Sequence, residues 1–253
     1  PVEDTAGKVN ILLQGFLDNC RVNSFTLQSD MNYIAQNAGR IARALFEICL
    51  KRGWSTMSSH FLGLAKAIDQ RMRPNQTPLR QFRTEIPSDI ALKIEDADAN
   101  VDRLYDMEAN EIGELIKNKK YGAKIFDLLR RLPYLEVNAF VQPITRGVLR
   151  INLDVISSFK WTDKYHGGMV SFWLWIEDGE NEYIYHSERL TIQKKYAKES
   201  QSLEITIPVR EPLPPQYYIR VVSDTWVGCE SVTTLSFQHL MLPTMYAAHT
   251  DLL

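Results

Sequence analysis

The spacing of hydrophobic positions changes once along this chain, near Pro133. Before that point apolar residues recur every three or four positions, which is typical of amphipathic helices. After it apolar and polar residues alternate, as they do in strands with one buried face. The pattern therefore predicts a multidomain fold, α-helical in its first half and all-β in its second.

The first region, residues 1–82, is predicted to be a helical bundle. Its main helix is expected from about Ser29, a candidate cap, to Arg52. Gly53 then supplies a left-handed stop, and Ser55 begins the next helix. A proline-rich stretch after that helix marks the end of the region.

The second region, residues 83–133, is predicted to contain short helices and to form a helix-loop-helix domain. One helix follows Ser88, and a later pair meets through a basic joint at Lys119, Lys120 and Gly122. The two lysines and the amides of the following helix are candidate phosphate contacts, although the residues alone favour a solvated turn.

Residues 134–242 contain seven strand-like segments separated by turn sequences. Seven short alternating strands in this length predict an immunoglobulin- or fibronectin-like β-sandwich, for which Trp173 is a candidate core residue. Residues 243–253 are predicted to be a linker.

The helix expected from Ser29 to Arg52 has an uneven surface. At about 100° per residue its apolar arc covers roughly 200°, more than the single stripe of a surface helix. We therefore expect other helices to enclose that arc. The remaining strip is polar and cationic and contains Tyr33, Gln36, Asn37, Arg40, Arg43, Ala44, Glu47 and Lys51.

Two interpretations of this strip remain open from the residues alone. The strip is either the solvated face of a mostly buried helix, which the pattern favours, or the lining of a channel for an anionic chain. In a channel, Arg and Lys would contact phosphates, while the amides and the tyrosine would touch sugars and bases.

Composition and charge narrow the class of protein. The formal charge of −2 argues against a generally basic nucleic-acid binder, but residues 1–82 carry ten basic and six acidic residues. Three scattered cysteines form no CxxC pair and favour a reducing compartment. No apolar run is long enough to cross a bilayer, and the start of the chain does not resemble a signal peptide. We expect the chain to be part of a longer protein.

Motifs that carry catalysis or bind metals are absent from the sequence. The Gly7-Lys8 pair lacks the other residues of a phosphate-binding loop, and there is no GxSxG elbow. The five histidines and three cysteines do not have the spacing of metal ligands. We expect no catalytic residue and no metal site in this chain.

Several stretches resemble the accessory module of the large two-cassette, Ski-like superfamily-two RNA helicases, a module that a subunit of the ER translocon shares. They include SDMNYIAQNAGRIARALFEICLKRGW, RLYDMEANEIGELI, VQPITRGVLRINL and EPLPPQYYIRVVSDTWVGCE. The matching stretches occur in the family's order over essentially the whole chain, and they are long enough to be specific.

The resemblance implies the order helical bundle, helix-loop-helix domain, immunoglobulin-like domain and linker toward a second helicase cassette. It also implies that the helix from Ser29 to Arg52 is the ratchet helix, which crosses the central pore and contacts the translocating strand. The positions that match the strand-facing ones are Asn37, Arg40, Arg43 and Ala44, with Gln36 and Lys51 as outer contacts.

The resemblance is strongest to the spliceosomal branch of the family, which unwinds small nuclear RNA duplexes in the U-five particle. It implies a nuclear, non-catalytic module without a cofactor of its own, attached to lobes that use ATP and Mg²⁺. The implied partners are single-stranded RNA, the RecA-type lobes and winged-helix domain of the same chain, a second cassette and spliceosomal regulators, with no membrane. The alternatives are the activating-signal-cointegrator branch, or a scaffold module of an ER protein-translocation subunit without nucleic acid.

Overall fold

A computed structural model of the chain describes residues 4–180, 182–210, 213–238 and 240–243. The elements before Pro133 are helical and those after it are mainly antiparallel strands, which confirms the predicted change from α to β. The chain folds into two compact units. The first comprises residues 1–49, 57–132 and 224–229, and the second comprises residues 50–56, 133–223 and 230–253. All of the expected linker except Pro243 lies outside the described residues.

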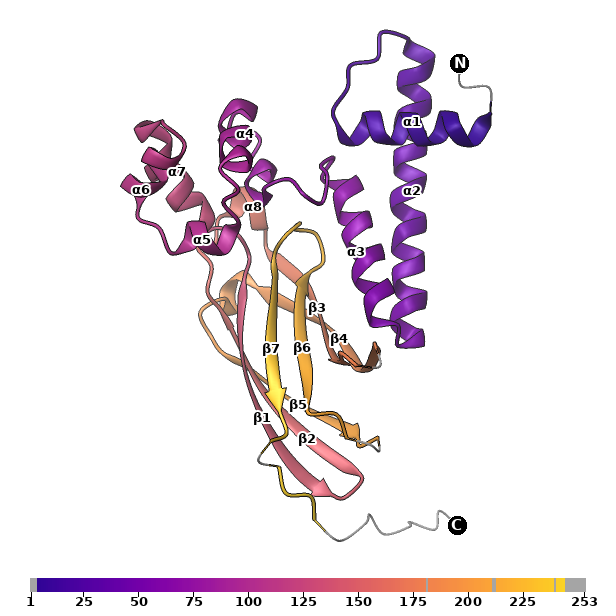
Figure 1. Ribbon diagram of the computed structural model, residues 1–253, viewed down its shortest axis with the longest axis vertical. Coiled ribbons are helices and arrows are strands. Elements are labelled where there is room, and N and C mark those ends of the chain that lie inside the picture. Colours follow the sequence, from indigo (N-terminus) through magenta and orange to yellow (C-terminus); the bar gives the residue numbers. More distant parts are fainter. Residues whose placement is uncertain (1–3, 181, 211–212, 239, 244–253) are drawn as a thin grey trace. The chain divides into compact units, whose positions relative to one another are not determined.

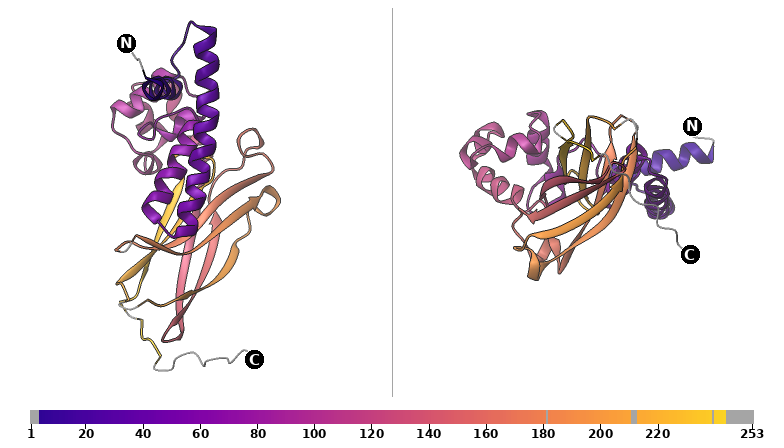
Figure 2. Two further views of the ribbon diagram at one scale, coloured as in Figure 1. Left: turned by 90° about the vertical axis from the view of Figure 1, so that its right-hand side faces the viewer. Right: turned by 90° about the horizontal axis from the view of Figure 1, so that it is seen from below.

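The helical elements come first in the chain (Figure 1). Their bounds are α1 Thr5–Leu17, α2 Phe25–Arg52, α3 Ser55–Asp69, the 3₁₀ helix η1 Pro78–Gln81, α4 Ser88–Asp96, α5 Val101–Tyr105, α6 Ala109–Leu115 and α7 Lys119–Leu129. Helices α2 and α3 run side by side, and α1 crosses α2 (Figures 1 and 2). No helix in the described part of the chain combines the length and hydrophobicity needed to cross a bilayer.

Helix α2 begins earlier than the sequence predicted. The Ser24 hydroxyl accepts a hydrogen bond of 3.4 Å from the Leu27 N–H, so Ser24 rather than Ser29 lies at the start. The predicted end is correct, because Gly53 has a φ of 76° and its N–H bonds to the Leu50 carbonyl at 3.1 Å. The extra turn makes α2 a helix of 28 residues.

Helices α6 and α7 pack closely against each other at a glycine. A Cβ at Gly122 would lie 2.2 Å from the Ala109 carbonyl oxygen and 2.8 Å from the Gly113 nitrogen. Gly122 therefore lies at the contact between the two helices and not in the joint, which Ile116, Lys117 and Asn118 form instead. The absence of a side chain at this position allows the two backbones to approach closely.

One ion pair connects η1 to α4. The Arg80 guanidinium donates to both oxygens of Glu95, at 2.7 and 2.8 Å, and the Thr77 N–H donates to the same carboxylate at 2.9 Å. The hydrogen bonds from Arg80 hold the pKa of Glu95 below its ordinary value, with burial opposing them and the Thr77 bond adding to them.

The seven predicted strands are all present. Their bounds are β1 Leu135–Thr145, β2 Val148–Ser157, β3 Met169–Asp178, β4 Tyr183–Gln193, β5 Gln201–Pro208, β6 Gln216–Ser223 and β7 Glu230–Ser236, with the short helices α8 Asp163–His166 and η2 Lys194–Tyr196 between them. They form two antiparallel sheets, with the orders β1-β2-β5 and β4-β3-β6-β7. Apolar side chains from both sheets share one core, in which Ile151, Leu174 and Ile219 are fully buried.

The candidate core tryptophan was assigned to the wrong face of its strand. In β3 the side chains of Phe172, Leu174 and Ile176 enter the shared core, so Trp173 points to the other face, where it is half-buried. Trp175 lies on that same outer face and is fully buried, and its indole N–H donates to Glu177 at 2.7 Å. Trp175, Ile176 and Glu177 are all buried, so burial does not alternate between the two faces at this end of β3.

Gly122→Ala is expected to lower the free energy of unfolding by about 1–3 kcal/mol, because a methyl group at this contact forces α6 and α7 apart. Gly63→Ala is the matched control, since a Cβ at that α3 position meets nothing within 4 Å and alanine favours a helix. Urea denaturation of both variants checks this, and a Gly122→Ala protein as stable as the Gly63→Ala protein would contradict the packing.

Stability is expected to fall in acid through Glu95. Its folded pKa lies below the ordinary value of 4.5, so its contribution is present above that pH and is lost as the pH falls through the folded pKa. Urea denaturation at about pH 6 and about pH 3.5 should show a smaller loss for Glu95→Gln than for the unmodified chain. Glu114→Gln, at an exposed position, is the control. An identical pH dependence in the unmodified and Glu95→Gln proteins would contradict the assignment.

Candidate nucleic-acid interface

One face of α2 is buried against its neighbours in the first unit. Met31, Ala35, Ala42 and Phe46 are almost completely buried and follow one another at helical spacing. Between them, a Cβ at Gly39 would lie 3.2 Å from the Asp69 carboxylate and 3.6 Å from Ile68 in α3. The small residues thus allow α3 to approach α2 closely, and this contact fixes the rotation of α2 about its axis.

The rotation places most of the predicted contact residues in solvent. Gln36, Arg40, Ala44 and Lys51 are exposed. Tyr33 belongs to the same strip, and 70% of its surface is accessible. The guanidinium of Arg40 makes no hydrogen bond or ion pair with any residue that the structure describes. Asn37 is half-buried, and its amide donates to the Tyr33 carbonyl at 2.9 Å.

Arg43 is placed differently from the other predicted contact residues. Its guanidinium donates to the Asp224 carboxylate at 2.5 Å and to the Asp224 backbone oxygen at 2.7 Å. A weaker ion pair joins it to Asp69 at 3.4 Å. Its side chain is 28% exposed. Arg43 therefore binds within the first unit, and we do not retain it as an RNA contact.

Sequence reasoning missed this interaction because Asp224 follows Arg43 by 181 residues. Asp224 lies in the segment between β6 and β7 that belongs to the first unit. The stretch SDTWVG carries no local signal of a partner in α2. The same segment contains Trp226, whose ring lies 5.4 Å from that of Phe82.

The expectation that other helices enclose the apolar arc of α2 is wrong for the described chain. Ile41 and Ile48 are 60% and 52% exposed, and Leu45 is 36% exposed. Within the first unit, α1 and α3 cover only the side that carries Met31 and Phe46. The exposed surface of α2 thus has a cationic half, centred on Arg40, and an apolar half, centred on Ile41.

The joint between α6 and α7 forms a second cationic patch. Lys119 and Lys120 are exposed in the first turn of α7 and make no ion pair with any described residue. Asn118, at the N-terminal cap, offers no side-chain hydrogen bond to the helix, so the first amides of α7 remain available. Two ammonium groups beside free amides suit the binding of phosphate.

No group of three or more His, Cys, Asp or Glu side chains is arranged to hold a metal ion in the described ranges. Cys20 is exposed, Cys49 and Cys229 are buried, and none of the three forms a disulfide.

Comparison with known proteins identifies the family. Residues 1–236 match the family model described as the Sec63 Brl domain, and the chain belongs to this family. It is 44% identical over 252 residues to the U5 small nuclear ribonucleoprotein 200 kDa helicase of Homo sapiens. It is 46% identical over 255 residues to the Activating signal cointegrator 1 complex subunit 3 of Gallus gallus. Each comparison covers 100% of this chain and 12% of the relative. The resemblance to the helicase accessory module is confirmed.

Arg43→Gln is expected to lower the free energy of unfolding by about 1–2 kcal/mol, because Asp224, whose side chain is only 14% exposed, loses a charged partner. Arg40→Gln, on the same helix, should change it by no more than about 0.5 kcal/mol. Thermal and urea denaturation of the two variants check this. Equal losses of stability would contradict the assignment of a stabilising ion pair to Arg43 and not to Arg40.

Proposed function

We propose that this chain is a non-catalytic accessory module of an ATP-dependent RNA helicase that unwinds small nuclear RNA duplexes in pre-mRNA splicing. In this proposal α2 is the ratchet helix and guides the translocating single strand. The observation that carries the proposal is the exposed strip of α2 around Arg40, which faces away from the helix's buried side. The family and the 44% identity to a helicase of the U5 particle support it.

The strip has the chemistry that sequence-tolerant strand binding requires. Arg40 and Lys51 supply positive charge for phosphates, and Gln36 and Asn37 supply amides. The exposed ring of Tyr33 is able to stack on a base, and the short side chain of Ala44 leaves room for the strand. At about 1.5 Å per residue α2 is about 42 Å long, enough to contact several nucleotides.

Lys119 and Lys120 form the second proposed contact. Their position in the uncapped first turn of α7 favours a phosphate of the strand. Each phosphate contact adds to the salt dependence of binding, so the isolated chain should bind RNA weakly and lose the interaction as salt rises.

The domain boundaries are part of the proposal: a helical bundle at residues 1–82, a helix-loop-helix domain at 83–133 and an immunoglobulin-like domain at 134–242. The strand orders β1-β2-β5 and β4-β3-β6-β7 support a fibronectin-like arrangement of the last domain. The proposed partners are the RecA-type lobes, which use ATP and Mg²⁺, the winged-helix domain, a second cassette reached through residues 243–253, and spliceosomal regulators. The proposed location is the nucleus.

A second candidate is the same module in the activating-signal-cointegrator branch of the family. The 46% identity to a subunit of that complex favours it as much as the 44% identity favours the spliceosomal branch. The α2 strip would have the same role in both cases, because the proposal depends on Arg40 and its neighbours and not on the regulators.

Arg40→Glu in the helicase that contains this chain is expected to lower duplex unwinding by about 10-fold or more, because a phosphate contact becomes a repulsion. The melting temperature should change little, since Arg40 is exposed and has no described partner. Unwinding of a labelled RNA duplex and thermal denaturation, measured on the same preparation, check both parts.

Arg103→Glu is the matched control for charge, since Arg103 is exposed on α5 and has no described ion-pair partner. It should leave unwinding unchanged. The proposal would be rejected if Arg40→Glu lowered unwinding and stability together, or if Arg103→Glu impaired unwinding equally.

A further inference from the structure

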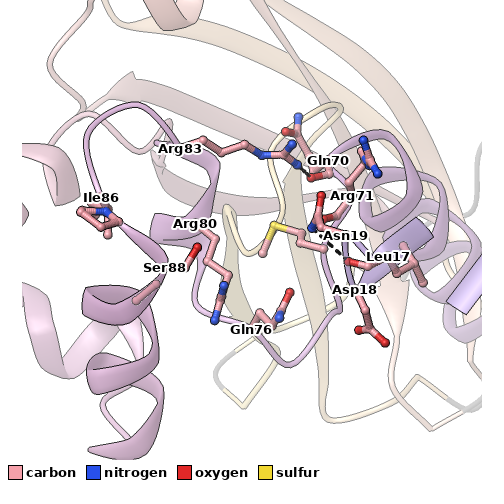
Figure 3. Close-up of a pocket in the computed structure, with 13 residues that line it drawn as sticks. Leu17, Asp18, Asn19, Gln70, Arg71, Gln76, Arg80, Arg83, Ile86 and Ser88 are labelled. Atoms are coloured by element: carbon pink, nitrogen blue, oxygen red, sulfur yellow. Dashed lines mark hydrogen bonds between the residues drawn. The ribbon is translucent and has the colours of Figure 1, made fainter. Parts of the chain in front are cut away.

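The first unit contains a cavity of about 490 Å³, formed where α1 ends, α3 ends and η1 leads to α4 (Figure 3). Its polar lining is rich in arginine and amide groups. The polar lining residues are Asp18, Asn19, Gln70, Arg71, Gln76, Arg80, Arg83 and Ser88. None of them belongs to the exposed strip of α2 or to the joint between α6 and α7, so the cavity is separate from both proposed RNA contacts.

Two charged residues that line the cavity, Arg80 and Asp18, each form an ion pair with a residue of opposite charge. Arg80 forms the paired hydrogen bonds with Glu95 described above. Asp18 accepts hydrogen bonds from Arg73 at 2.5 and 2.6 Å. Both carboxylates are therefore unavailable to compensate other positive charges in the cavity.

Arg71 and Arg83 remain without a carboxylate partner among the described residues. Arg83 donates to the Gln70 backbone oxygen, which brings its guanidinium toward Arg71 (Figure 3). Burial, and then the positive charge of Arg71, lower the pKa of the Arg83 guanidinium. The two ion pairs described above are neutral. Arg71 and Arg83 therefore leave the cavity with two uncompensated positive charges.

The guanidinium of Arg71 stacks on an aromatic ring. It lies over the Phe16 ring, 4.2 Å from the centroid, and its Nε is buried without a hydrogen-bond partner. The backbone is left-handed at both Arg71, with a φ of 47°, and Asn19, with a φ of 55°. The Asn19 amide donates to the Arg71 carbonyl at 3.2 Å. A non-glycine residue rarely adopts this conformation, and here two of them meet beside an unsatisfied donor.

The start of α4 contributes further donors. Helix α4 begins at Ser88, and Pro87 at its cap provides no side-chain hydrogen bond. The Ser88 amide and hydroxyl are therefore available at the cavity wall, where the helix dipole favours an anion. Asp89 also lies in this first turn, but it is exposed and does not line the cavity.

The apolar part of the lining includes Met72, Ile86 and Ala91, which are buried. A cavity for inorganic phosphate alone needs no such wall, and the volume exceeds that of a single ion. An apolar wall beside two unpaired guanidinium groups suits a ligand with a planar organic part and one phosphate.

We propose that this cavity binds one nucleotide, with its phosphate held between Arg71 and Arg83 and its base or sugar against the wall at Met72 and Ile86. The nucleotide is either free or one unit of an RNA strand, because both present the same phosphate and base. The site goes beyond the proposed guiding of RNA by α2 and does not depend on it.

Isothermal titration of the 253-residue chain with uridine 5′-monophosphate, inorganic phosphate and uridine tests the site directly. The monophosphate should bind more tightly than phosphate, and uridine should not bind measurably. Arg71→Met and Arg83→Gln should each weaken the binding of the monophosphate by about 10-fold or more, since each removes a charged donor. The affinity of Arg83→Lys for the monophosphate should lie between those of the unmodified chain and Arg83→Gln. A lysine keeps the positive charge but loses the planar guanidinium that can donate two hydrogen bonds at once.

The control variants are Arg103→Gln, at an exposed arginine outside the cavity, and Arg40→Glu, on the α2 strip. Both should retain the affinity for the monophosphate. Arg40→Glu is expected to fail in unwinding. If this variant keeps its affinity for the monophosphate, binding in the cavity does not depend on the proposed function of α2. A melting temperature within a few degrees of the unmodified chain confirms that each variant folds.

Competition with a short oligouridylate distinguishes the two sources of the nucleotide. Displacement of the monophosphate by the oligomer assigns the cavity to a nucleotide of a strand, and retention of the monophosphate assigns it to a free nucleotide. Unchanged affinity in folded Arg71→Met and Arg83→Gln proteins would overturn the site. Equal affinity for phosphate and the monophosphate would overturn the assignment of a nucleotide.

Discussion

The close contact between α2 and α3 determines what α2 presents to solvent. It depends on three small residues at helical spacing, Ala35, Gly39 and Ala42, which allow the backbone of α2 to approach Ile68 and Asp69. Because a helix is rigid, fixing one side of it fixes the direction of every other side chain. Arg40, on the far side of this contact, is therefore held in solvent. A methyl group at Gly39 would lie 3.2 Å from the Asp69 carboxylate, so the Asp69 side chain would have to shift by a few tenths of an ångström.

The ion pair between Arg43 and Asp224 divides the cations of α2 by role. Arg43 lies at the border of the buried face, where it joins the helix to the segment at residues 224–229 of the same unit. Arg40 is one turn earlier and has no described partner. Two arginines three positions apart thus differ in burial and in charge compensation. One stabilises the unit, and the other remains available to an anionic ligand.

The sequence was sufficient for features that depend on local patterning. The helical first half, the seven strands and the stop at Gly53 were all predicted correctly, because period, cap and turn residues act over short distances. The errors lie where the outcome depends on distant residues. Trp173 was placed in the core, but Trp175, which makes a buried hydrogen bond with Glu177, is the fully buried tryptophan.

The candidate sites also depend on residues that lie far apart in the sequence, so the sequence alone did not predict them. The partner of Arg43 comes from the segment after β6, and the cavity around Arg71 combines the ends of α1 and α3 with the start of α4. No spacing along the chain indicates either arrangement. The exposure of Ile41 and Ile48 was also unexpected, since an apolar arc does not reveal which part of it the described helices cover.

The central claim is that the strip around Arg40 lies against a translocating RNA strand. Photo-crosslinking from a benzoylphenylalanine at position 44, in the helicase acting on RNA, tests it most directly. Ala44 is exposed within the strip, and the same group at Ile11, which is 54% exposed on α1, serves as the comparison. An RNA crosslink from position 44 that is much stronger than that from position 11 is the expected result. An absent crosslink at position 44, or equal crosslinking from both positions, would contradict the claim.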